Sequence, residues 1–283
     1  MSGPMNFELE LRLKTLWGAS SMPFASTVSE PYAHPGQEQV MSELRQLLSC
    51  RSSGVLHGAN GVGKTVLLER LSEALSEKLY SIARLTHTTL SGSDLLRVLG
   101  GLLGIAPRFR RSDVASQILA GWEKLAPRHP VLILDEAQNL SAPALEELRL
   151  LYCSHGRLAG SERRAPFSLL LVGDEDLIPR LQMGVNRPLQ SRLGFCLQLH
   201  PFDQEQTQAY LESRWREVGV AATPMEQTAV VLLHQASGGI ARTLNNLSVL
   251  AITAAAQANV RMITGQQVQT AMSQIPWLTP ARE

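Results

Sequence analysis

Residues 54–65 read GVLHGANGVGKT, a short apolar run followed by a glycine-rich loop that ends in lysine and threonine. The segment from Gly58 to Thr65 fits the pattern GxxxxGK[ST] at every fixed position. Glycines let backbone N–H groups curl around a polyphosphate without Cβ interference, and a helix starting at the end of the loop adds a favourable dipole. Because a strand pattern precedes the loop and an amphipathic helix pattern follows it, we interpret the segment as a phosphate-binding loop rather than a chance glycine-rich turn.

The loop pattern indicates a different role in nucleotide binding for each of its polar residues. Lys64 is expected to reach the β- and γ-phosphates of a nucleotide, and the Thr65 hydroxyl is expected to ligate Mg²⁺. The predicted nucleotide-binding positions are Gly58, Asn60, Gly61, Val62, Gly63, Lys64, Thr65 and Val66. The cofactors that follow from these tasks are ATP and Mg²⁺.

A second stretch, VLILDEAQ at residues 131–138, is an apolar run that ends in two carboxylates. A strand that ends beside the phosphate-binding loop would deliver Asp135 to the Mg²⁺ shell, and Glu136 could then polarise a water for attack on the γ-phosphate. An Asp-Glu pair is otherwise an ordinary solvated strand end. Its place at the carboxyl end of a buried strand, downstream of the loop, favours the functional interpretation.

Short apolar runs alternate with amphipathic helical patterns between about residues 53 and 199. Such alternation indicates crossover connections and a parallel sheet. The continuous apolar runs at 131–134 and 169–172 are typical of strands buried on both faces. Strands are predicted at 54–57, 80–85, 131–135, 167–172 and 195–199, and helices at about 64–78, 93–103, 113–125 and 142–152.

Strand patterns stop at Pro201, and helical patterns follow. We expect helices that start at Asp203, at Thr223 as an N-cap before Pro224, at Ala241 and at Thr264. We predict three parts: an N-terminal segment over 1–50, an α/β nucleotide-binding domain over 51–200 and a small helical domain over 201–283. The helix from Gln37 to Leu48 in the first part is expected to pack on the core.

Composition and charge exclude several classes of protein. Apolar residues make up 44% and charged residues 18%, which excludes a disordered chain, a collagen-like chain and a disulfide scaffold. The net charge of +1 excludes a uniformly basic coat, so any contact with nucleic acid has to come from a local patch. The three isolated cysteines and the lack of an apolar run of about 18 residues favour a cytoplasmic protein with no membrane partner.

With both motifs in place, the sequence resembles the AAA+ ATPases, in which they correspond to the Walker A and Walker B elements. The resemblance implies an α/β fold, an AAA+ P-loop core with a five-stranded parallel sheet, and a small C-terminal all-helical lid. It also implies a sensor-1 role for Asp174, at a position where Asn, Ser or Thr is commoner. The alternative for Asp174 is that it caps the helix that follows, and both roles can hold together.

Two arginines have counterparts in the same family. The segment PLQSRL at 188–193 resembles the arginine-finger segment, which implies that Arg192, or Arg187 in its place, reaches the γ-phosphate of a neighbouring subunit. The segment GGIAR at 238–242 resembles the sensor-2 motif, which implies that Arg242 contacts the γ-phosphate. The alternatives are a solvated helix residue for Arg192 and an exposed arginine after a helix C-cap for Arg242.

Segments 134–140, 146–151 and 169–177 are similar to the ExeA-type ATPases, a group that includes type II secretion ATPases and transposition regulators of the TnsC and MuB kind. This resemblance implies a homo-oligomer, a hexameric ring or helical filament, that binds duplex DNA with ATP and recruits or activates a transposase. Secretion members carry a transmembrane segment and a periplasmic domain after the ATPase, and neither is expected before Glu283. A secretion-associated ATPase and a nucleotide-dependent scaffold with little hydrolysis remain alternatives.

The region between the second and third strands faces DNA in the TnsC-like ATPases, and here it contains the run RFRR at 108–111. Arginines on a loop beside a helix N-terminus can bind phosphates without reading sequence. The DNA contacts that we expect are Arg108, Arg110, Arg111 and Thr88. A solvated charged loop is the alternative, and a second basic cluster is formed by Arg157, Arg163 and Arg164.

Overall fold

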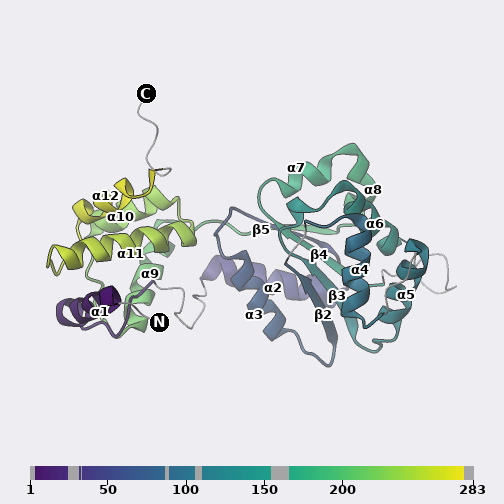
Figure 1. The fold of residues 1–283 in the computed structure, drawn as a ribbon, viewed down its shortest axis with the longest axis horizontal. Coiled ribbons are helices and arrows are strands. Elements are labelled where there is room, and N and C mark those ends of the chain that lie inside the picture. Colours follow the sequence, from purple (N-terminus) through teal and green to yellow (C-terminus); the bar gives the residue numbers. More distant parts are fainter. Residues whose placement is uncertain are drawn as a thin grey trace. The chain divides into compact units, whose positions relative to one another are not determined.

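The structure is a computed structural model of the chain, and it describes residues 4–24, 32, 34–86, 89–105, 110–153 and 166–276. The chain forms two compact units, which we describe one at a time (Figure 1). The α/β unit comprises residues 36–59 and 64–199. The helical unit comprises residues 1–35, 60–63 and 200–283.

The α/β unit contains a five-stranded sheet in the order β2-β3-β4-β1-β5. All four pairs of neighbouring strands are parallel, with Val55 opposite Leu171 and Leu132 opposite Leu169. The strands are β1 (Gly54–His57), β2 (Tyr80–Leu85), β3 (His129–Leu134), β4 (Ser168–Gly173) and β5 (Phe195–Gln198). This confirms the predicted parallel five-stranded sheet; β1 and β2 have the predicted bounds, and the ends of β3, β4 and β5 differ from the prediction by at most two residues.

The central strands explain the continuous apolar runs in the sequence. Strands β3 and β4 are buried at every residue, whereas the edge strand β5 is partly exposed. One face of the sheet packs with α4, α5 and α6 in a cluster that includes Val55, Leu132 and Leu171, and α2 and α3 cover the other face (Figure 1). The helices are α2 (Pro35–Ser49), α3 (Lys64–Ala74), α4 (Gly92–Leu102), α5 (Arg111–Glu123), α6 (Ala142–Cys153), α7 (Leu177–Gln182) and α8 (Arg187–Gln190), with short 3-10 helices η1 (Ala137–Asn139) and η3 (Gly184–Asn186).

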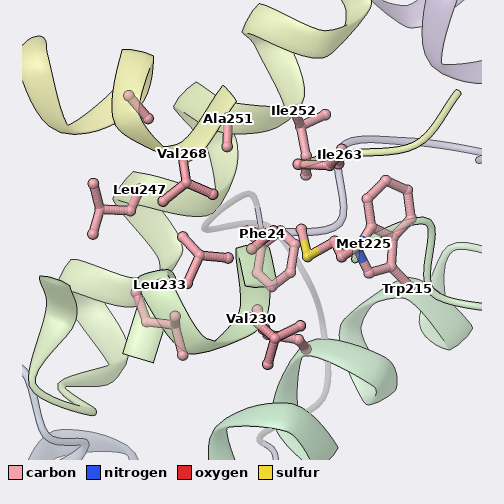
Figure 2. Close-up of a cluster of buried hydrophobic side chains, with 14 of the residues drawn as sticks. Phe24, Trp215, Met225, Val230, Leu233, Leu247, Ala251, Ile252, Ile263 and Val268 are labelled. Carbon is pink, nitrogen blue, oxygen red and sulfur yellow. The ribbon is translucent and has the colours of Figure 1, made fainter. Parts of the chain in front are cut away.

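The helical unit has its own core, a cluster that includes Trp215, Leu233, Leu247 and Val268 (Figure 2). Its helices are α1 (Pro4–Trp17), α9 (Gln204–Glu217), α10 (Gln227–Ser237), α11 (Ala241–Gln257) and α12 (Gly265–Ser273). Capping boxes begin two of them, at Asp203 for α9 and at Thr264 for α12. These two starts confirm the sequence prediction.

One helix starts later than the sequence predicts. Thr223 has the residue pattern of an N-cap, but α10 begins at Gln227, with Glu226 at its N-cap position. The Ile263 N–H donates to the Pro224 carbonyl at 2.8 Å, and the Glu226 N–H donates to the Ile263 carbonyl at 2.9 Å. This extended pairing buries Ile263 in the core, so a tertiary contact overrides the local helix signal.

The N-terminal segment is also divided differently from the expected 1–50 unit. Its second helix, α2, belongs to the α/β unit, but residues 1–35 belong to the helical unit. The Trp17 indole N–H donates to the Arg261 carbonyl at 2.6 Å, and its ring lies edge-on to Trp215 at 5.7 Å between centroids. Leu13 is buried in the helical core, so apolar packing with α9 and α11 draws α1 to this unit. Across the described ranges, each helix is too short or too polar to cross a bilayer.

Candidate active site

The phosphate-binding loop joins β1 to α3, as the sequence predicts. Gly61 and Gly63 have φ values of 86° and 112°, which residues with a Cβ adopt only with strain. The loop therefore depends on its glycines for the path of its backbone. This backbone fits a bound polyphosphate.

Lys64 is the first residue of α3 and is only 5% exposed. Its ammonium group donates to the Gly58 carbonyl at 2.8 Å and to the Ala59 carbonyl at 3.2 Å. A buried ammonium is stable only where hydrogen bonds or negative charge compensate its lost hydration. The loop carbonyls hold this cation inside the loop, where the phosphates of a nucleotide would add negative charge. Thr65 follows Lys64 and is exposed, so its hydroxyl is accessible to a ligand.

Asp135 and Glu136 follow the last residue of β3. Asp135 is 4% exposed, and its two carboxylate oxygens have different partners. Oδ2 accepts a hydrogen bond from Arg84 Nη2 at 2.7 Å, and Oδ1 accepts one from the Glu136 N–H at 3.1 Å. Arg84 lies on β2, which pairs with β3, so the parallel sheet places an arginine beside the predicted metal ligand. The sequence gives no sign of this role for Arg84, because no local pattern connects it with Asp135.

The described residues offer few side chains that could bind a metal ion together. No group of three or more His, Cys, Asp and Glu side chains gathers there in a way that could hold a metal ion. A site built from Thr65, Asp135 and phosphate oxygens needs no such group, because Mg²⁺ usually keeps waters and takes one or two protein ligands plus phosphates. The residues present therefore fit the predicted Mg²⁺ site.

Glu136 is connected to Asp174 through the side chain of Gln138. The Gln138 Nε2 donates to Glu136 Oε2 at 2.7 Å and to Asp174 Oδ2 at 3.1 Å. Glu136 itself has a left-handed backbone with φ of 54°. A non-glycine residue in this region stores about 1–3 kcal/mol of strain, and such strain is common at functional sites.

The N-cap role that the sequence offered as an alternative for Asp174 belongs to a residue two positions later, although Asp174 does form local bonds in the turn before α7. Its Oδ1 accepts a hydrogen bond from the Asp176 N–H at 3.1 Å, and its carbonyl accepts one from the Leu177 N–H at 3.3 Å. Asp176 occupies the N-cap position of α7. Asp174 therefore stabilises the turn into α7 and at the same time contacts the amide of Gln138.

The predicted arginines lie in different units. Arg187 begins α8 and is exposed, and Arg192 is exposed in the turn after α8, with its guanidinium donating to the Pro188 carbonyl. Arg242 lies in the helical unit, where its backbone N–H donates to the Gly61 carbonyl at 3.1 Å. A Cβ on Gly61 would lie 2.7 Å from the Arg242 Cβ, which is a second reason for glycine at this position. Their roles as finger and sensor remain predictions.

The predicted DNA contacts are only partly within the described residues. Arg110 is exposed at the N-cap position of α5, and Arg111 is the first residue of that helix. Thr88, Arg108 and the second basic cluster of Arg157, Arg163 and Arg164 lie outside the described residues. The DNA-binding surface therefore remains a prediction.

Comparisons with known proteins agree with this geometry. The AAA domain family matches residues 44–181, which contain both motifs. General secretion pathway protein A of Aeromonas hydrophila is 26% identical over 252 residues, which cover 84% of this chain and 44% of that protein. Mu-like prophage FluMu DNA transposition protein B of Haemophilus influenzae is 28% identical over 144 residues, which cover 51% of this chain and 45% of that protein. The chain thus spans less than half the length of either relative.

Solved structures share the fold. Cdc6p from Pyrobaculum aerophilum superposes with a TM-score of 0.67 at 20% identity, over 89% of this chain and 70% of that one. The Holliday junction branch migration motor RuvB of Thermotoga maritima superposes with a TM-score of 0.54 at 17% identity, over 86% of this chain and 70% of that one. These likenesses concern the fold alone. By its AAA domain match over residues 44–181 and by its two relatives, the chain is similar to the AAA+ group that contains the ExeA-like and MuB-like proteins.

Proposed function

We propose that the protein binds ATP with Mg²⁺ and hydrolyses it, with Glu136 as the general base. The observation that supports this most directly is the buried Lys64 ammonium, held by the carbonyls of a glycine-dependent loop. Lys64 and the loop amides would hold the phosphates, and Thr65 and Asp135 would hold the metal. When bound, Mg²⁺ would neutralise phosphate charge. Glu136 would accept the proton of the attacking water.

We further propose that the ATP-bound protein assembles on duplex DNA and recruits or activates a transposase. The relative from Haemophilus influenzae is named a DNA transposition protein, which supports this partner class. With a net charge of +1, one subunit offers few contacts to DNA phosphates. An assembly that aligns many weak patches on one duplex multiplies the effective affinity. Arg110 is exposed at the N-cap position of α5, next to Arg111, the first residue of that helix.

A secretion-associated ATPase is the second candidate, because General secretion pathway protein A matches a larger share of this chain than the transposition relative does. Electron microscopy distinguishes the transposition function from the secretion function. The protein is imaged with duplex DNA, once with a non-hydrolysable ATP analogue and once with ADP. Rings or filaments only with DNA and the ATP analogue are expected for the transposition function. ATP hydrolysis without DNA binding at low salt would favour the secretion function, and no phosphate release under any condition would favour a scaffold.

A further inference from the structure

The side chain of Gln138 lies between two carboxylates that come from different strand ends. Glu136 follows β3, and Asp174 follows β4, the neighbouring strand. One nitrogen of Gln138 is 2.7 Å from Glu136 Oε2 and 3.1 Å from Asp174 Oδ2, and the amide oxygen is 3.3 Å from the Asp174 backbone nitrogen. Only an NH₂ group can donate to both carboxylates, and only the oxygen can accept from the backbone N–H, so the chemistry defines the orientation of the amide.

The surroundings of Gln138 hold this bridge in place. Arg180, on α7, donates from Nη1 to the Gln138 carbonyl at 2.9 Å, and its guanidinium also contacts the Leu140 carbonyl. The Arg180 carbonyl in turn accepts a hydrogen bond from Asn186 at 2.8 Å. Gly173 completes the fit, because a Cβ there would lie 2.6 Å from the Gln138 amide oxygen. The backbone of η1 and the side chain that leaves it are thus both fixed.

We propose that Gln138 is a positioning residue that holds the carboxylate of Glu136 in the orientation needed for its role as base. This inference rests on the proposed ATPase function. Two like charges close to one amide nitrogen would repel each other once that donor is removed, and this repulsion would change the orientation of the Glu136 carboxylate. A misplacement of about 1 Å in a reacting group can lower a rate about 100-fold. Nucleotide affinity should be preserved, because the phosphate-binding loop is unaltered.

The test compares Gln138→Leu and Gln138→Glu with the wild type. Leucine has a similar size and no donor, and an ionised glutamate has the same shape but adds a third negative charge. Gln46→Leu, at an exposed position on α2, is the matched control. Steady-state phosphate release yields kcat and KM, titration with a fluorescent ATP analogue yields the nucleotide Kd, and circular dichroism melting checks the fold. Both Gln138 variants should lose about 10- to 100-fold in kcat, with KM and Kd within about threefold of the wild type.

A double variant separates positioning from a general structural role. In Glu136→Gln protein there is no base to position, so adding Gln138→Leu should lower the residual rate less than about threefold. An equal loss in both backgrounds, a normal or raised kcat in Gln138→Leu, or failure of both Gln138 variants to fold would overturn the inference. If Glu136→Gln alone hydrolyses ATP at the normal rate, it is the assignment of the base in the proposed function that fails.

Discussion

The carboxylate of Asp135 accepts a hydrogen bond from the guanidinium of Arg84 at 2.7 Å, so the proposed metal ligand at the end of β3 is paired with an arginine of β2. Asp135 is 4% exposed, and an ion pair with little water around it is weakly screened. Arg84 therefore holds Asp135 in place and also competes with any second cation for its charge.

Because Arg84 is paired with Asp135, we expect an Arg84→Gln variant to need less Mg²⁺ than the wild type. Without the guanidinium, the carboxylate of Asp135 has more charge available for a metal, so half-maximal binding of ATP should need several-fold less Mg²⁺. The measurement is a titration with Mg²⁺ of fluorescent ATP-analogue binding. Arg149→Gln, which removes an ion pair with Glu146 on α6, is the control and should leave the titration unchanged. A higher or equal Mg²⁺ requirement in the Arg84 variant would contradict the competition.

Binding and hydrolysis should separate between two variants. Lys64→Ala should abolish nucleotide binding, because the phosphates lose the cation that the loop carbonyls hold. Glu136→Gln should bind ATP normally but hydrolyse it about 10²- to 10⁴-fold more slowly, because that is the contribution of a positioned base. Equilibrium binding and phosphate release measure the two effects. Normal hydrolysis by Glu136→Gln would rule out Glu136 as the base.

The arginine finger predicts complementation between subunits. If Arg192 acts on a neighbour's nucleotide, activity should rise steeply with protein concentration, and Arg192→Ala should lose activity without losing ATP binding. A mixture of Arg192→Ala and Lys64→Ala proteins should recover part of the activity, since each supplies what the other lacks. The measurement is phosphate release over a range of mixing ratios. If folded and assembled variants show no recovery at any ratio, Arg192 does not work across an interface, and Arg187→Ala should be mixed next.

The DNA patch predicts a change in salt dependence. Replacing Arg108, Arg110 and Arg111 by Ala should weaken binding to all duplex sequences alike and flatten the dependence of log Kd on log salt concentration. The slope should fall by about 0.9 for each lost phosphate contact. Fluorescence anisotropy with labelled duplex and an ATP analogue measures the slope, and nucleotide binding without DNA is the control. An unchanged slope would shift the proposed interface to Arg157, Arg163 and Arg164.

We expect the protein to become less stable toward unfolding in acid because of His129. Burial, together with the nearby charge of Arg51, lowers the pKa of His129 to about 4, and its Nε2 lies 2.9 Å from the Ser168 hydroxyl. Between about pH 6.5 and pH 4 the unfolded chain binds a proton that the folded chain does not, so the free energy of unfolding should fall as the pH falls through this range. The loss from this group approaches about 3 kcal/mol as the pH falls through 4 and levels off below that pH.

Urea unfolding at pH 7, 5.5 and 4.5 measures this dependence. His129→Gln keeps a polar side chain at the position but cannot titrate, so its free energy of unfolding should depend less on pH than that of the wild type. His200, which is exposed, provides the control variant His200→Gln, and its pH dependence should match the wild type. Equal pH dependence of His129→Gln and the wild type would show that other groups cause the acid sensitivity.

Local sequence was sufficient for much of the fold. The apolar runs of β3 and β4 mark buried strands because every residue in them has to avoid water. The phosphate-binding loop can be found without a structure, because its glycines and its lysine lie within one short segment. The chemistry of phosphate binding explains why each of these residues is needed at its position. The same holds for the capping boxes at Asp203 and Thr264, whose partners lie three residues away.

Tertiary structure decided what depends on residues far apart in the chain. The pairing of Met225 with Ile263 delays the start of α10, and the packing of Trp17 against Trp215 draws α1 to the helical unit. In the candidate site, Arg84 and Asp135 are 51 residues apart, and Gln138 and Asp174 are 36 apart. Neighbouring parallel strands bring these pairs together, and no local pattern reports which strands are neighbours, because side-chain periodicity encodes burial and not strand order.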